Sequence, residues 1–235
     1  MKTQLCGRIL LIIIFAVAAV LWAGEPWKDK PWTEWTEKDV KKLLEKSPWV
    51  KRGKYTVYEK ARNPPVRVPG WSDRDEGKTR ARTVHPFTVV WFSALTMREA
   101  FVRQRQLQGI PSEDDRDLLS RQPEHYEIML YGPHARFYCD PPSSAYLRPK
   151  RSKQKLSPVR VQLRGLRDRE SKQVVWEYRF YFRRNLAGKP TIGPDEKEVE
   201  FNCLEGPLNL VTKDYKVYKT VFNLQKMKRA GKPDI

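Results

Sequence analysis

The 235-residue chain has few of the residues from which metal sites and familiar catalytic centres are built. Its three histidines, His85, His125 and His134, stand neither in an HExxH motif nor at a spacing that would gather zinc with the cysteines. A GxSxG elbow, a Walker loop and a dinucleotide glycine pattern are absent as well. The sequence therefore predicts no catalytic residues, no metal site and no cofactor. Scattered catalytic residues leave no motif, so this argues against enzymes without excluding them.

The chain also has only one long apolar run. Residues 9–23 are apolar without interruption, and Lys2 and Arg8 are the only charges before Glu25. A helix that spans a bilayer needs about 20 residues, whereas the core of a signal peptide has about 7–15. We therefore interpret residues 1–23 as a signal peptide and expect the protein to be periplasmic or secreted. Cleavage after Ala23 would place bulky Leu21 three residues before the cut, so an uncleaved inner-membrane anchor stays open as the alternative.

Cysteine is scarce, and only Cys139 and Cys203 follow the apolar run. An oxidising compartment permits a disulfide between them. A loop of this length would contribute about 4 kcal/mol in the loop-entropy treatment. The alternative is that both are small buried hydrophobic residues, because each shares a strand face with apolar neighbours.

Acidic residues are outnumbered, 28 against 46 basic residues, and the formal net charge is +18. Removal of residues 1–23 takes away two positive charges and leaves +16. A basic surface attracts nucleic acid, anionic lipid or acidic polymers. Export favours anionic lipid or a polyanionic envelope polymer over intracellular nucleic acid; the alternative is that the charge only keeps the protein soluble. The candidate anion-binding residues are Lys150, Arg151, Lys153, Lys155, Lys226, Lys228, Arg229 and Lys232.

Two segments carry helix signals. Thr36 followed by Asp39 is close to a capping box, and Ser47-Pro48 supplies a stop, so we predict a helix over residues 36–46. Thr96 and Glu99 form a full capping-box pattern, which predicts a second helix over residues 97–108.

Four of the eight tryptophans lie around the first of these helices. We expect Trp35 and Trp49 to dock the two helix ends. Trp27 and Trp32 stand in a proline-containing segment, where they pack on the domain or lie at a membrane interface.

The second half of the chain alternates between apolar and polar residues. The clearest run places Val174, Trp176, Tyr178, Phe180 and Phe182 on one face. Such alternation predicts antiparallel strands with one solvated face. We expect an α+β fold, with the two main helices packed on an antiparallel sheet or sandwich. The expected domain covers residues 24–235, with a Trp/Pro-rich start and a long loop over residues 62–83.

Three stretches carry a resemblance: the helix ending in SPW, the segment VVWFSALTMREA, and the strand KEVEF with the GPL turn that follows it. They resemble small exported proteins of uncharacterised function of the kind found in acidobacteria. The resemblance implies export and a common fold, and implies no activity and no site residues.

These observations together predict an exported, non-enzymatic binding or structural module of the cell envelope with a basic surface. The alternative is a hydrolase of envelope polymers whose active site carries no motif.

Overall fold

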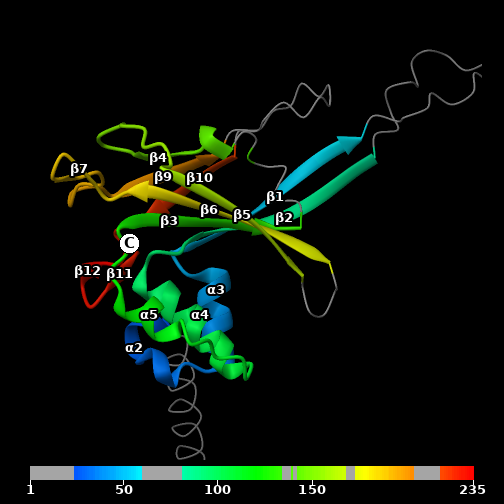
Figure 1. Cartoon of the computed structure of the whole chain (residues 1–235), viewed down its shortest axis with the longest axis vertical. Helices are drawn as coiled ribbons and strands as arrows, with labels where there is room; N and C mark the ends of the chain where they lie inside the picture. Colours follow the sequence, from blue (N-terminus) through cyan, green and yellow to red (C-terminus); the bar gives the residue numbers. More distant parts are fainter. Residues whose placement is uncertain (1–23, 60–80, 134–138, 140–141, 168–172, 204–217) are drawn as a thin grey trace, which may run out of the picture.

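The computed structural model describes residues 24–59, 81–133, 139, 142–167, 173–203 and 218–235 (Figure 1). The predicted signal segment lies outside this part. Most of the expected loop at 62–83 does too, although its last three residues already belong to a strand that begins at Ala81.

Five antiparallel strands form the main sheet, in the order β1-β2-β3-β6-β5. Their bounds are Val50–Glu59 (β1), Ala81–Trp91 (β2), His125–Gly132 (β3), Val174–Arg183 (β6) and Arg160–Arg167 (β5). A three-stranded antiparallel sheet has the order β10-β9-β4, with bounds Tyr218–Asn223, Glu198–Cys203 and Tyr146–Pro149. Two small hairpins complete the described strands: β7 (Asn185–Leu186) with β8 (Lys189–Pro190), and β11 (Lys228–Arg229) with β12 (Lys232–Pro233).

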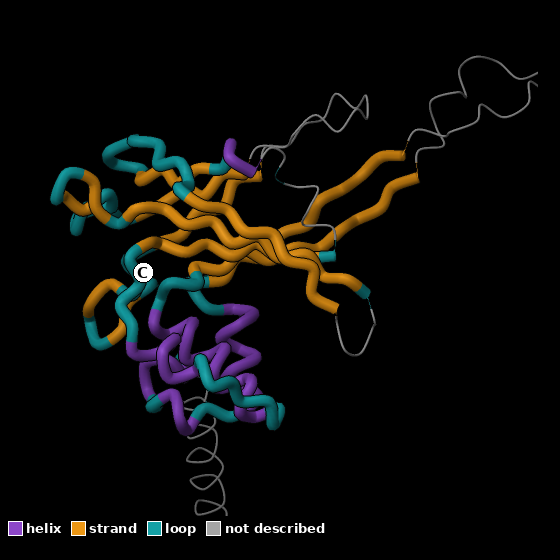
Figure 2. Tube along the Cα trace, in the orientation of Figure 1, coloured by secondary structure: helices purple, strands orange, loops and turns teal. Residues whose placement is uncertain are grey.

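The helices gather on one side of the main sheet (Figure 2). They are α2 (Pro26–Asp29), α3 (Glu37–Lys46), α4 (Leu95–Leu107) and α5 (Asp115–Ser120), with a short 3-10 turn at Trp32–Glu34. A second 3-10 turn, Pro142–Ser144, lies on the other side, directly before β4. The three-stranded sheet packs on the opposite face, where the ring of Phe180 lies 5.3 Å from that of Phe201 and the ring of Trp91 lies 5.2 Å from that of Phe222. The predicted α+β fold with two main helices on an antiparallel sheet is confirmed.

In strand β6 the alternation of residues corresponds to two faces with different coverings. Tyr178, Phe180 and Phe182 are all buried, because they face the second sheet. The opposite face was expected to be solvated, and at β6 that expectation is wrong. Glu177 is only 7% exposed, and the guanidinium of Arg179 lies 4.5 Å from the centre of the Phe92 ring. The segment that leads into α4 therefore covers this polar face.

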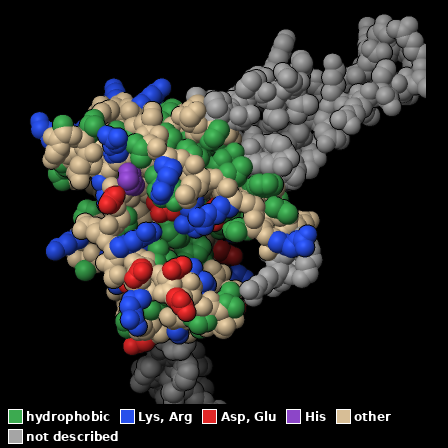
Figure 3. Space-filling view, viewed as in Figure 1, with side chains coloured by type: hydrophobic (Ala, Val, Ile, Leu, Met, Phe, Trp, Pro, Cys, Tyr) green, Lys and Arg blue, Asp and Glu red, His purple; other side chains and the backbone are tan. Residues whose placement is uncertain are grey.

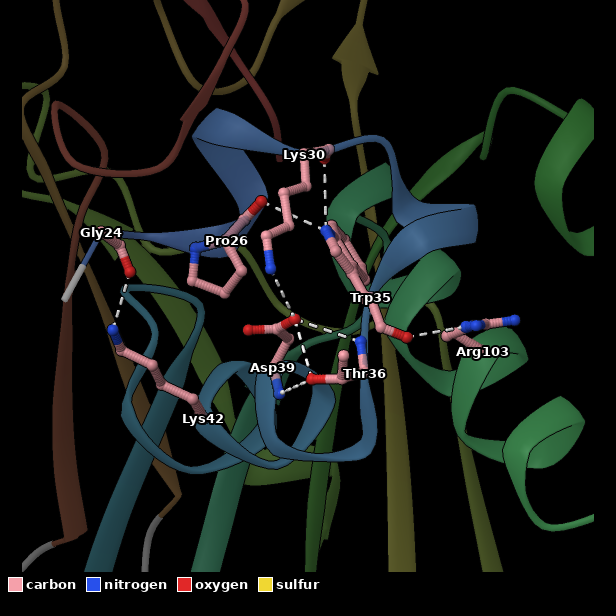
Figure 4. Close-up of polar contacts among 8 residues, drawn as sticks. All are labelled: Gly24, Pro26, Lys30, Trp35, Thr36, Asp39, Lys42 and Arg103. Atoms are coloured by element: carbon pink, nitrogen blue, oxygen red, sulfur yellow. Dashed lines mark hydrogen bonds and ion pairs between the residues drawn. The ribbon is translucent and has the colours of Figure 1, made fainter. Parts of the chain in front are cut away.

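Helix α3 begins as its sequence predicts (Figure 4). The Asp39 amide donates to Thr36 Oγ1 at 3.2 Å, and the Thr36 amide donates to Asp39 Oδ2 at 3.1 Å, so the capping box is complete. Trp35, the residue before the cap, donates its indole N–H to the carbonyls of Pro26 and Lys30, both at 3.2 Å. Its own carbonyl accepts from Arg103 Nε of α4 at 2.9 Å. The start of α3 is thus tied both to the N-terminal segment and to the second helix.

The tryptophans around α3 belong mainly to the core. Trp35 and Trp49 are fully buried, as expected for residues that dock the helix ends. Trp27 is 7% exposed and meets Trp49 edge-on at 6.1 Å, while Trp32 is half-buried against the same cluster. Of the two alternatives for Trp27 and Trp32, packing on the domain is therefore the one observed.

Helix α4 starts two residues before its predicted first residue and is capped differently. Ala94 occupies the N-cap position and has no side chain to accept a hydrogen bond. The carboxylate of Asp234, far along the chain, caps the helix instead. It accepts from the amide of Leu95 at 2.7 Å and from that of Thr96 at 3.0 Å. The predicted Thr96–Glu99 capping box is wrong, because Glu99 is bound instead by Arg229.

The C-terminal segment that supplies this cap is held at several points. The backbone carbonyl of Asp234 accepts from the indole of Trp49 at 2.6 Å, and Arg184 donates to the carbonyl of Ile235. The segment thus links α4, the end of α3 and the end of β6.

The substitution Asp39→Asn tests how much the capping box contributes to the free energy of unfolding, because that contribution should depend on pH. Burial raises the pKa of Asp39, but the Thr36 hydrogen bonds and Lys30 outweigh it, so the pKa lies below its ordinary value of 3.8. A lowered folded pKa gives stability that is present above the unfolded pKa and disappears as pH falls through the folded pKa. We expect the variant to lose about 0.5–1 kcal/mol of unfolding free energy at pH 5–7, and nothing below the folded pKa. Urea unfolding between pH 2.5 and 7 measures this.

Glu37→Gln is the control, because it removes a charge from the same helical turn and leaves the box intact. A pH-independent difference between the native protein and the Asp39 variant would contradict the assignment.

Candidate anion-binding surface

Of the two basic segments predicted to bind anions, residues 150–155 and the first residue of the C-terminal segment, Lys226, come to the same end of the three-stranded sheet. There β4 ends, β9 begins and β10 ends, because β9 runs antiparallel to both neighbours. The Lys150 amide donates to the Glu198 carbonyl at 2.9 Å, and the Leu224 amide donates to the Lys197 carbonyl at 2.8 Å. Strands lie about 4.8 Å apart, so the two outer strands are separated by about 10 Å. We call this end of the sheet the basic end; its cationic residues are Lys150, Arg151, Lys153, Lys155, Lys197 and Lys226.

The loop over residues 150–155 has a defined shape because a buried carboxylate holds it. Glu196 accepts from the amide of Arg151 at 3.0 Å and from that of Ser152 at 2.9 Å. Lys153 adopts a left-handed conformation, with φ 57°, and its amide returns to the Pro149 carbonyl at 2.9 Å. Because Glu196 binds backbone donors, the basic residues of the loop remain exposed on the surface.

Part of this positive charge is offset within the chain. Lys150 Nζ lies 3.9 Å from the buried carboxylate of Glu200, which Arg148 already holds at 2.9 Å. Arg151 pairs with Asp195 at 3.3 Å, in an exposed pair worth little in water.

Lys226 adds a charge close to Lys51 of β1. Burial lowers the pKa of Lys51, and repulsion from Lys226 lowers it further. Positive charges from the two sheets therefore come near one another at this end of the molecule.

The other C-terminal candidates divide between the surface and the interior. Lys228 and Lys232 are exposed on the β11–β12 hairpin. Arg229 instead donates to Glu99 of α4. Burial raises the pKa of Glu99, and the Arg229 contact opposes that rise. Arg229 is therefore a structural residue that neutralises a buried acid, and it is not part of the basic end.

Figure 3 shows how the charges are distributed on one face of the molecule. Lysine and arginine side chains lie over the strands and their loops and also over the helices below, whereas most of the aspartate and glutamate side chains in this view lie over the helices. The sequence alone does not reveal where the acidic side chains gather, because both signs of charge occur throughout the chain.

Cys139 and Cys203 form a disulfide, with Cα atoms 5.3 Å apart. Cys203 ends β9, so it lies at the other end of the three-stranded sheet from the basic end. The bond joins β9 to the segment that precedes β4.

A second polar group lies beneath Phe92, in the segment that leads into α4. Arg179 of β6 donates to Glu127 of β3 at 3.0 Å and to Glu177 at 2.6 Å. Burial lowers the pKa of Arg179, but the two carboxylates outweigh it and raise the pKa overall. Both carboxylates are thus bound by the same buried guanidinium. Only the strand register, which the sequence does not contain, reveals this group.

Two further observations concern the described residues. None of their helices is long and apolar enough to cross a membrane, and no three of their histidine, cysteine, aspartate or glutamate side chains are placed to hold a metal ion. Comparisons with protein-family models, curated proteins and solved structures found no match. Function must therefore be inferred from the surfaces of this chain.

Reduction of the disulfide tests its contribution to stability. In a Cys6→Ser background, only Cys139 and Cys203 remain. We expect reduction to lower the unfolding free energy by about 2–5 kcal/mol. Denaturant unfolding with and without a reductant measures the difference, and the Cys139→Ala/Cys203→Ala variant should be indifferent to the reductant. Two titratable thiols in the untreated protein would refute the bond.

Proposed function

We propose that this protein is an exported, non-enzymatic module of the cell envelope that binds an anionic surface through the basic end. The observation that carries the proposal is the convergence of residues 150–155, Lys197 and Lys226 at one end of the three-stranded sheet. Anionic lipid and a polyanionic envelope polymer present the same chemistry to this end, namely closely spaced negative groups.

The fixed backbone of the loop at 150–155 favours a role in binding over a role in solubility alone. Lysines that only keep a protein soluble need no fixed backbone, yet the loop at 150–155 is fixed by the buried carboxylate of Glu196. A fixed loop loses less conformational entropy when it binds. Basic groups near an anionic membrane contribute roughly 1 kcal/mol each, and the attraction weakens as salt is added.

The disulfide supports the export part of the proposal, because such bonds persist mainly in oxidising compartments. The hydrolase alternative receives no comparable support. The buried acids Glu127 and Glu177 are both bound by Arg179.

Cosedimentation with vesicles tests the proposal. We expect binding to anionic vesicles at low salt, weaker binding at high salt, and none to neutral vesicles, because the attraction is electrostatic. The variant Lys153→Glu/Lys197→Glu/Lys226→Glu should bind at least about tenfold more weakly, since each lysine contributes roughly 1 kcal/mol. The same assay on an insoluble anionic polysaccharide distinguishes a polymer from lipid.

The matched control is Lys38→Glu/Lys41→Glu/Lys46→Glu, which makes the same change in net charge on exposed positions of α3. Equal losses in the two variants would show that overall charge, and not the basic end, is responsible. Absence of binding to any anionic surface at low salt would refute the proposal.

A further inference from the structure

The outer edge of strand β5 has the features of a binding site for an extended peptide. β5 is the last strand of the main sheet and pairs only with β6 within the described part of the chain. An edge strand presents unpaired backbone N–H and C=O groups, which can pair with a further strand. Most residues of β5 are exposed, so the described structure leaves its side chains accessible as well.

The edge combines exposed apolar residues with arginine. Val159 precedes the strand and is 47% exposed, while Leu163 and Leu166 within it are 45% and 48% exposed. Edge strands are commonly protected by charge and by short length. Arginine supplies the charge here, but a protected edge does not also need large apolar side chains on its surface.

The two faces of β5 differ in chemistry. On the face shared with the helices, Arg160 stacks over the Tyr181 ring at 3.9 Å, and the Tyr181 hydroxyl donates to Gln162 Oε1 at 2.9 Å. Arg164 lies two residues beyond Gln162 on the same face. The stacking holds the guanidinium of Arg160 in place, which favours recognition of a carboxylate.

The opposite face of the same edge is apolar as far as Gly165 and ends in Arg167, whereas Leu166 lies on the face of Arg160 and Arg164. Leu163 lies there, and Gly165 is paired with Trp176 of β6. A Cβ at Gly165 would come within 3.3 Å of the Trp176 ring and of the Val174 side chain. The glycine thus leaves room for the indole to extend toward the edge of the sheet, beside Val174, which is 43% exposed.

We infer that β5 binds an extended segment of a partner protein in which acidic residues alternate with apolar ones. Added to the sheet, such a segment places its acidic side chains beside Arg160 and Arg164 and its apolar side chains beside Leu163 and Trp176. Its backbone pairs with the open edge of β5. A second copy of this chain fits less well, because two β5 strands would bring together the three arginines of each, Arg160, Arg164 and Arg167.

This site is separate from the basic end. It lies on another sheet, and it recognises an alternating strand and not simply negative charge. The two proposals can therefore fail independently.

The probe is a fluorescent ten-residue peptide that alternates glutamate with valine, measured by anisotropy with the full chain. We expect saturable binding, with protection of the β5 amides from hydrogen exchange, because strand addition occupies the backbone. One control peptide replaces the glutamates with glutamine, and the other replaces two central valines with proline. Both should bind at least about tenfold more weakly, since one lacks the charge and the other cannot form the backbone ladder.

The protein variants separate this site from the basic end. Arg160→Glu/Arg164→Glu should lose peptide binding by at least about tenfold and keep vesicle binding, as expected when two attractive pairs become repulsive. Lys153→Glu/Lys226→Glu should do the reverse. Unchanged thermal unfolding of the two variants shows that each is folded.

Three results would overturn the inference. Failure of the peptide to bind would mean that the arginines only protect the edge. Equal binding of the proline peptide, without protection of β5, would mean that charge alone is recognised. Protection of the same amides by self-association, without peptide, would identify a second copy as the occupant.

Discussion

The packing of the helices on the sheet depends on one carboxylate. Asp234 accepts from the first two amides of α4, which carry the positive end of the helix dipole, while its backbone carbonyl accepts from Trp49 at the end of α3. Both main helices are therefore held by one residue near the C-terminus. Arg229, in the adjacent hairpin, neutralises Glu99 one turn into α4, so the same segment also satisfies a buried acid.

This arrangement leaves parts of both sheets available for binding. The helices cover one face of the main sheet, and the three-stranded sheet covers the other. Two accessible places on the described strands are the basic end, where β4, β9 and β10 meet their loops, and the edge of β5. Binding at either place needs no rearrangement of the core, because both lie on strands whose inner faces are already packed. The proposed functions are thus those of a rigid scaffold that presents two chemically different surfaces.

The sequence predicts the features that depend on neighbours in the chain. The capping box of Thr36 and Asp39 joins residues three positions apart, and the alternation of β6 is visible within ten residues. The cap of α4 is not predictable in this way, because its acceptor lies 139 residues from Leu95. The basic segments are evident in the sequence, but the meeting of residues 150–155 with Lys197 and Lys226 at one end of a sheet depends on strand order. The polar face of β6 was misjudged because alternation indicates two faces and does not tell what covers them.

Hydrogen exchange of the α4 amides, compared between Asp234→Ala and the native protein, tests the dependence on Asp234 most directly. Asp195→Ala is the control, because it removes an exposed acid that pairs with Arg151 at the basic end, away from the helices. We predict faster exchange across Leu95–Leu107 and around Trp49 in the Asp234 variant, with β9 and β10 unchanged. Native protection of α4 in that variant would contradict the claim that the C-terminal segment holds the helices on the sheet.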